Sequence, residues 1–144
     1  MQAYLELQSY PDVLPALKSL REREAGIRLA FLSNMTPHML DNAIKSSGLE
    51  GIFEPSLGTD KVRVYKPDPR ACRMGIDAFM LQREEIVFAA FGDWDAAGAK
   101  LFGYPTFWVN RLNLPVEELG VAPRCHWPKP EGSGGFRKGQ TVVR

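Results

Sequence analysis

Polar and charged side chains stand in this sequence where they could bind a small anion. Ser33 and Asn34 directly follow one apolar run, and Asp95 comes shortly after a second apolar run. Lys66 directly precedes a proline-rich turn. Hydroxyl and amide donors, one ammonium and carboxylates near strand ends suit a small anionic substrate. Each of Ser33, Asn34 and Asp95 could equally be only a helix cap or turn residue. Because all three clusters of polar residues lie near expected strand ends, the sequence favours a binding site for a small anion over three unrelated caps and turns.

The first half of the chain predicts a βα unit with clear boundaries. Ile27–Leu32 is short and apolar, which is typical of a buried parallel strand. Thr36 and Pro37 then match the N-cap and first position of a helix that ends at Gly48. A preceding helix is expected to begin at Pro11-Asp12 and to end at Gly26.

The second half continues the alternation of strands and helices. Asp68 is predicted to cap a helix whose first residue is Pro69, and Gly92–Asp95 is predicted to lead a buried strand into a helix of small residues. The expected extended segments are 52–53, 61–65, 86–91 and 106–110, and a short final helix is expected over 115–119. This order predicts an α/β fold with a mostly parallel sheet, in which ligands bind beyond the carboxyl ends of the strands.

Charge divides the chain into two parts. The 144 residues carry a net charge of +1, with 44% hydrophobic and 24% charged residues, as in one ordinary globular domain. Residues 1–120 carry −3, whereas residues 121–144 carry +4 and are rich in glycine and proline. We expect a core over 1–120 and an extended or disordered basic tail over 121–144. A solvated tail is favoured over a nucleic-acid-binding arm.

Composition argues against several classes of partner and location. The balanced charge gives no case for nucleic acid, and no apolar run approaches the roughly 18 residues of a membrane span. The N-terminal residues do not form a secretory signal, so we expect a cytoplasmic protein. The cysteines and histidines are isolated in the sequence, which predicts no metal site and no metal cofactor. These residues are Cys72, Cys125, His38 and His126.

The motifs, taken in order, resemble a type II haloacid dehalogenase of the haloacid dehalogenase-like hydrolase superfamily. The resemblance runs from about Tyr4 to about Leu119. It rests on Phe31-Leu32-Ser33-Asn34, Val64-Tyr65-Lys66-Pro67-Asp68 and Trp94-Asp95-Ala96-Ala97-Gly98-Ala99. It implies a Rossmann-like three-layer core and hydrolysis of the carbon–halide bond of short 2-haloalkanoic acids, without metal or organic cofactor.

The resemblance also implies roles for the candidate residues. An aspartate carboxylate displaces the halide from the α-carbon, and water hydrolyses the ester that forms. Ser33 and Asn34 would bind the substrate carboxylate or orient the nucleophile. Lys66 would keep the nucleophile ionised. Asp95 would position Lys66 and the hydrolytic water, and a homodimer is possible by the same resemblance.

The sequence departs from the family pattern most clearly at the nucleophile. The family carries it in an Asp-x-x-Gly-Thr segment that ends the first strand, and none of the seven aspartates here is followed by this pattern. We therefore interpret the chain as N-terminally truncated, without the first strand and most of the cap, and expect it to be inactive alone. That strand would lie between the strands ending at Ser33 and Phe91, so these two strands are expected to face a gap or to pair abnormally with each other.

Further departures keep other functions open. Ala90 and Gly92 replace a serine and an asparagine of the family, and Cys72 stands where tyrosine is common. One alternative is a non-catalytic α/β module, a pseudoenzyme that binds a small anion or a protein partner through Ser33 and Lys66. A phosphatase of the same superfamily is a minor alternative. It would need a second carboxylate four residues before Asp95, where Phe91 stands.

Overall fold

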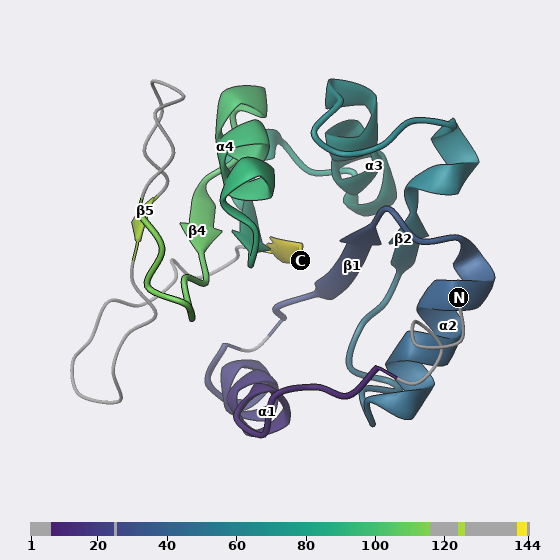
Figure 1. The fold of residues 1–144 in the computed structure, drawn as a ribbon, viewed down its shortest axis with the longest axis vertical. Coiled ribbons are helices and arrows are strands. Elements are labelled where there is room, and N and C mark those ends of the chain that lie inside the picture. Colours follow the sequence, from purple (N-terminus) through teal and green to yellow (C-terminus); the bar gives the residue numbers. More distant parts are fainter. Residues whose placement is uncertain (1–6, 25, 116–123, 126–140, 144) are drawn as a thin grey trace.

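The computed structural model describes residues 7–24, 26–115, 124–125 and 141–143 (Figure 1). Within these ranges helices and strands alternate, as predicted. The helices are α1 (Val13–Arg23), α2 (Pro37–Ser46), α3 (Pro69–Phe79) and α4 (Asp93–Phe102), with short 3₁₀ turns η2 (Thr59–Val62) and η3 (Arg83–Glu85). The strands are β1 (Leu29–Ser33), β2 (Ser56–Gly58), β3 (Ile86–Ala90), β4 (Thr106–Trp108), β5 (Arg124–Cys125) and β6 (Thr141–Val143).

One parallel sheet organises these elements. Its strand order is β2-β1-β6-β3-β4-β5, and every pairing between neighbours is parallel. The predicted α/β class with a parallel sheet is confirmed. In a parallel sheet the carboxyl ends of the strands meet at one edge, so the residues that follow β1 and β3 are brought to the same edge.

Alternating side chains of the central strands build two cores, one on each face of the sheet. On β3, Ile86 and Phe88 belong to the core beneath α3 and α4, whereas Val87 belongs to the core beneath α1. On β1, Ala30 and Leu32 join the first core and Leu29 joins the second. Because both faces are covered, the strands are apolar throughout, and the result is a three-layer sandwich (Figure 1).

The predicted helix starts before the site are confirmed in detail. The Thr36 hydroxyl accepts a hydrogen bond from the Met39 N–H at the start of α2. The Asp68 carboxylate accepts one from the Arg70 N–H at the start of α3. Hydrogen bonds from the Arg70 side chain and backbone lower the pKa of Asp68 to about 2. The negatively charged cap therefore persists well into acidic solution.

Three segments differ from the predictions or lie beyond the described residues. The first is 52–53, which was predicted to be extended but lies in no strand. Residues 59–62 form the 3₁₀ turn η2, so the extended segment predicted over 61–65 is wrong, and the extended residues nearby are those of β2. Val62 packs against the core beneath α3 from this turn, which explains its apolar character. The final helix predicted over 115–119 falls almost wholly on residues outside the described ranges.

The centre of the sheet holds the largest difference from the sequence prediction. Instead of a gap between β1 and β3, the structure has β6, which pairs in parallel with both strands. β6 and β5 both come from the predicted tail, whose remaining residues lie outside the described ranges. The division at residue 120 stays a prediction.

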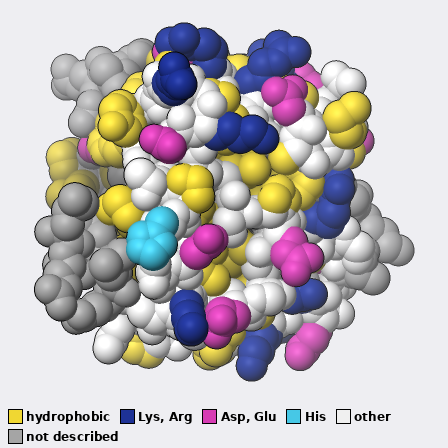
Figure 2. All heavy atoms as spheres, turned by 90° about the vertical axis from the view of Figure 1, so that its right-hand side faces the viewer, with side chains coloured by type: hydrophobic (Ala, Val, Ile, Leu, Met, Phe, Trp, Pro, Cys, Tyr) yellow, Lys and Arg dark blue, Asp and Glu magenta, His cyan; other side chains and the backbone are white. Residues whose placement is uncertain are grey.

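Two further observations concern the outside of the molecule. Figure 2 shows acidic and basic side chains interspersed on the face to which α2 and α3 contribute. Among the described residues, no helix combines the length and the apolar character needed to cross a membrane.

Candidate functional site

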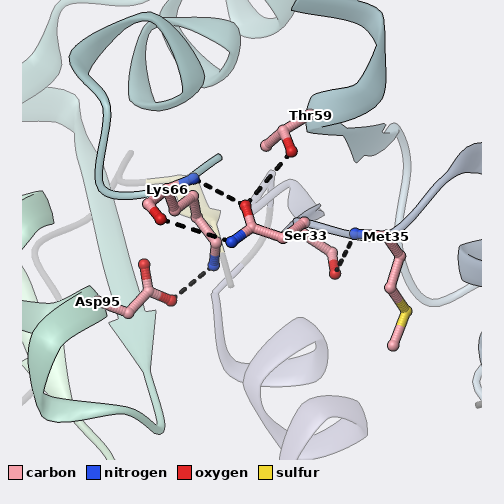
Figure 3. Close-up of polar contacts among 6 residues, drawn as sticks. Ser33, Met35, Thr59, Lys66 and Asp95 are labelled. Carbon is pink, nitrogen blue, oxygen red and sulfur yellow. Dashed lines mark hydrogen bonds and ion pairs between the residues drawn. The ribbon is translucent and has the colours of Figure 1, made fainter. Parts of the chain in front are cut away.

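The four predicted site residues come together at the carboxyl edge of the sheet (Figure 3). Ser33 is the last residue of β1, and Asn34 follows it. Asp95 lies in the first turn of α4, which follows β3 almost directly. Lys66 lies in the loop between η2 and α3. Residues far apart in the chain thus converge because their strands are parallel.

Lys66 and Asp95 form a largely buried ion pair. The Lys66 Nζ lies 2.6 Å from the Asp95 Oδ2, and the two side chains are only 9% and 12% exposed. Burial raises the pKa of Asp95 above its ordinary value, although the Lys66 ammonium acts in the opposite direction. The ammonium also lies 5.4 Å from the centroid of the Phe88 ring on β3. A single cation is therefore held in a defined place above the middle of the sheet.

Asn34 holds the backbone of Lys66. Its Oδ1 accepts hydrogen bonds from the Lys66 N–H at 2.8 Å and from the Thr59 hydroxyl at 3.3 Å. Its Nδ2 makes a longer contact, 3.5 Å, with the Lys66 carbonyl oxygen. The amide thus bridges β1 to the loop that carries the ammonium, so Asn34 is placed to position Lys66 (Figure 3).

Thr59 is a member of this network that sequence reasoning missed. It is fully buried at the start of η2, directly after β2. Because β2 is the neighbour of β1 in the sheet, Thr59 lies beside Asn34, and its hydroxyl finds a partner there. No strand was predicted over 56–58, so no signal in the sequence pointed to Thr59.

Replacing Asn34 with alanine is expected to destabilise the fold by about 1–3 kcal/mol, because the Lys66 N–H and the buried Thr59 hydroxyl lose their acceptor. The free energy of unfolding measured in urea checks this. Asn42→Ala on the exposed face of α2 is the matched control and is expected to cost far less. Equal losses for the two variants would show that Asn34 holds nothing in place.

Ser33 has a different local role. Its Oγ accepts a hydrogen bond from the Met35 N–H at 3.3 Å, which forms the turn after β1. Among the described residues, none accepts a hydrogen bond from the Ser33 hydroxyl, so this hydroxyl can donate to an anion at this edge.

Close packing of α4 against the Lys66 loop brings the ammonium to Asp95. A Cβ added at Gly98 would meet the Pro67 Cβ far inside the normal contact distance of two carbons. Gly98 lies one turn along α4 from Asp95, and Pro67 directly follows Lys66. The glycine therefore sets how near the loop can come to the helix.

Gly98→Ala is expected to lower stability by about 2 kcal/mol, since overpacking outweighs the gain in helix propensity. Thermal unfolding followed by circular dichroism measures the effect. Lys100→Ala, at an exposed position of the same helix, is the control and is expected to leave the melting temperature nearly unchanged. If Gly98→Ala also left it unchanged, the loop and α4 would not be in close contact.

Two positions at which this sequence replaces a polar residue of the resembled family carry no reactive group. Ala90 and Cys72 are buried, and burial raises the pKa of the Cys72 thiol to about 11. This thiol stays protonated at neutral pH and offers no nucleophile. Within the described ranges, no three His, Cys, Asp or Glu side chains gather as a group that could hold a metal ion.

Comparison with known proteins places this geometry in a family. The model of the haloacid dehalogenase-like hydrolases matches residues 1–103, which include all four site residues. The chain belongs to this family. It is 43% identical to haloacetate dehalogenase H-2 of Moraxella sp. (strain B) over 122 residues, 85% of this chain and 54% of that protein. It is 40% identical to an (S)-2-haloacid dehalogenase of Pseudomonas sp. (strain YL) over 121 residues, 84% of this chain and 51% of that protein.

A solved structure agrees with the sequence relatives. The crystal structure of the L-2-haloacid dehalogenase RSc1362 aligns with a TM-score of 0.81 at 37% identity, over 99% of this chain and 55% of that one. The resemblance predicted from the motifs is thereby confirmed. The chain spans about half the length of the curated relatives it matches.

Proposed function

We propose that this chain is the part of a 2-haloacid dehalogenase that supplies Lys66 and Asp95 to the active site. The single observation that carries the proposal is the buried Lys66–Asp95 pair at the carboxyl edge of the sheet. An ammonium held there is suited to attract a carboxylate, either that of the substrate or that of a nucleophile. Relatives named for dehalogenation of haloacetate and (S)-2-haloacids support this substrate class.

The proposed reaction assigns each residue a task. A nucleophilic carboxylate oxygen bonds to the α-carbon of the haloacid while the carbon–halogen bond breaks and the halide leaves with the bonding electrons. Water then hydrolyses the ester, which releases a 2-hydroxy acid and a proton and restores the carboxylate. Lys66 keeps that carboxylate ionised, and Asp95 orients Lys66 and the attacking water. Ser33 donates to the substrate carboxylate, and Asn34 acts through Lys66.

The nucleophile must be supplied by another segment. The 144 residues contain no Asp-x-x-Gly-Thr pattern, and the Lys66 ammonium is paired with Asp95. We therefore expect no halide release above background from this chain alone. We expect release when the N-terminal part of a relative is supplied.

The missing Asp-x-x-Gly-Thr pattern also supports an alternative, in which this chain is a non-catalytic module. In this case Ser33 and Lys66 would bind a small anion or a protein partner without turnover. Association into a homodimer and location in the cytoplasm also remain predictions. A phosphatase would need a carboxylate at the position of Phe91 and is the weakest candidate.

Chloride release tests the proposal directly. The chain is mixed with the part of haloacetate dehalogenase H-2 that it does not match. Chloroacetate and both enantiomers of 2-chloropropionate are then supplied. Release by the mixture, and not by either part alone, is expected, with preference for the (S) enantiomer. A folded mixture without release, or one that instead hydrolyses p-nitrophenyl phosphate with magnesium, would overturn the proposal.

A further inference from the structure

Residues 59–66 form a loop whose two ends are held by the same side-chain oxygen. The Asn34 Oδ1 accepts hydrogen bonds from the Thr59 hydroxyl at 3.3 Å and from the Lys66 N–H at 2.8 Å. Thr59 is fully buried, and the Lys66 side chain is only 9% exposed. The 59–66 loop is therefore anchored at both ends beside the Lys66–Asp95 pair (Figure 3).

The outer side of the 59–66 loop carries two cations, Lys61 and Arg63. Both are exposed, and neither forms an ion pair with an acid in the described part of the chain. Because successive Cα atoms are about 3.8 Å apart, the Arg63 Cα lies at most about 11 Å from that of Lys66. By the same reasoning, the Lys61 Cα lies within about 8 Å of that of Thr59. Both charges can therefore act on an anion at the site when little salt screens them.

The fold alone does not explain an arginine at position 63. Arg63 has a left-handed backbone conformation, with φ 53° and ψ 38°, and its N–H donates to the Asp60 carbonyl oxygen at the end of η2. Glycine adopts this conformation with less strain than arginine does. The Arg63 side chain nevertheless has no ion-pair or ring partner among the described residues. A strained position with a free charged side chain points to a function for the charge.

We propose that Lys61 and Arg63 form a cationic rim that draws a small anionic carboxylate from solution to the edge of the sheet where Ser33 and Lys66 lie. The rim acts at a distance, because it raises the local concentration of the anion and touches none of the reacting atoms. Asp60 is exposed next to Lys61 and weakens the rim by repelling an anion. That the carboxylate is a 2-haloacid rests on the proposed function; the attraction itself does not.

Salt dependence tests the rim in the chain complemented with the N-terminal part of a relative. Lys61→Gln with Arg63→Gln removes both charges. At about 10 mM salt this double variant is expected to lower kcat/KM for (S)-2-chloropropionate about fivefold, with kcat unchanged. At about 1 M salt, where screening acts within about 3 Å, its kcat/KM is expected to equal that of the wild type. A loss that persists at high salt, or no loss at low salt, would overturn the inference.

The matched control removes the same charge far from the rim. Lys18 and Arg23 are exposed on α1, which covers the opposite face of the sheet from α3 and α4. Lys18→Gln with Arg23→Gln is expected to leave kcat and KM unchanged at both salt concentrations. A low-salt loss as large as that of the rim variant would show that net charge alone matters and would overturn the assignment to Lys61 and Arg63.

Two single variants separate charge from structure. Arg63→Gly suits the left-handed backbone, so its melting temperature is expected to equal or exceed that of the wild type, while kcat/KM at low salt falls about twofold. Asp60→Asn is expected to raise kcat/KM at low salt by a similar factor. An Arg63→Gly protein that keeps the wild-type kcat/KM, or that is markedly less stable, would assign a structural role to Arg63 and overturn the inference.

Binding to the intact chain without complementation distinguishes a failure of the rim from a failure of the proposed function. Chloroacetate is titrated at low salt, and the amide signals of Asn34 and Lys66 are followed by NMR. Weaker binding by the Lys61→Gln, Arg63→Gln variant, with no chloride released by any complemented mixture, would support the rim and count against the proposed function. Chloride release with equal kcat/KM for this variant and the wild type at low salt would overturn the rim and leave the proposed function intact.

Discussion

Asp95→Asn is expected to lower the free energy of unfolding by about 3 kcal/mol, because it leaves the Lys66 ammonium buried without a counter-charge. The wild-type ammonium has the Asp95 carboxylate at 2.6 Å and is only 9% exposed as a side chain. An asparagine keeps the shape of the carboxylate but not its charge. Chemical denaturation of the two proteins at neutral pH measures the difference.

The matched control is an acid whose partner is exposed. Asp77 lies 3.6 Å from Arg73, and both side chains are at least 65% exposed. Asp77→Asn is therefore expected to cost well under 1 kcal/mol. A loss at Asp95 no larger than that at Asp77 would mean that solvent screens the Lys66–Asp95 pair.

Removing both charges distinguishes the stability that the ion pair contributes from the destabilisation caused by one unpaired buried charge. The double variant Lys66→Met with Asp95→Leu is expected to recover most of the stability lost in Asp95→Asn, since no ion then remains buried. If the double variant were as unstable as the single one, packing around Asp95 rather than charge would explain the loss.

Local sequence signals predicted those features of the fold that neighbouring residues determine. Thr36 before Pro37 and Asp68 before Pro69 identified two helix starts, because a cap and its proline act within one turn. The apolar run at 86–90 identified β3, because a strand covered on both faces must be apolar throughout. The candidate site followed from the parallel sheet, which brings Ser33 and Asp95 to one edge.

Features set by long-range contacts were not predictable in this way. The role of Asn34 depends on Thr59 and on the Lys66 backbone, which reach it only because β2 lies beside β1. Thr141–Val143 is only three residues long, and although all three residues are β-branched, no local feature indicated which strands it would pair with. Its pairing with β1 and β3 joins residues far apart in the sequence.

Lys66→Met is expected to reduce chloride release by about 100- to 1,000-fold when the chain is complemented with the N-terminal part of a relative. The ammonium is the cation that the described site offers to a carboxylate, and methionine keeps its length without its charge. The variant is expected to fold, because the Asp95 carboxyl, whose pKa burial already raises, can take up a proton once its partner is gone. Arg73→Met, at an exposed arginine, controls for loss of a positive charge.

The rate of chloride release from (S)-2-chloropropionate by these two complemented variants is the most direct test of the proposed active site. The site geometry predicts a near-complete loss for Lys66→Met and an unchanged rate for Arg73→Met, with both proteins folded. A folded Lys66→Met protein that releases chloride at the wild-type rate would contradict the assignment of the Lys66–Asp95 pair to the active site.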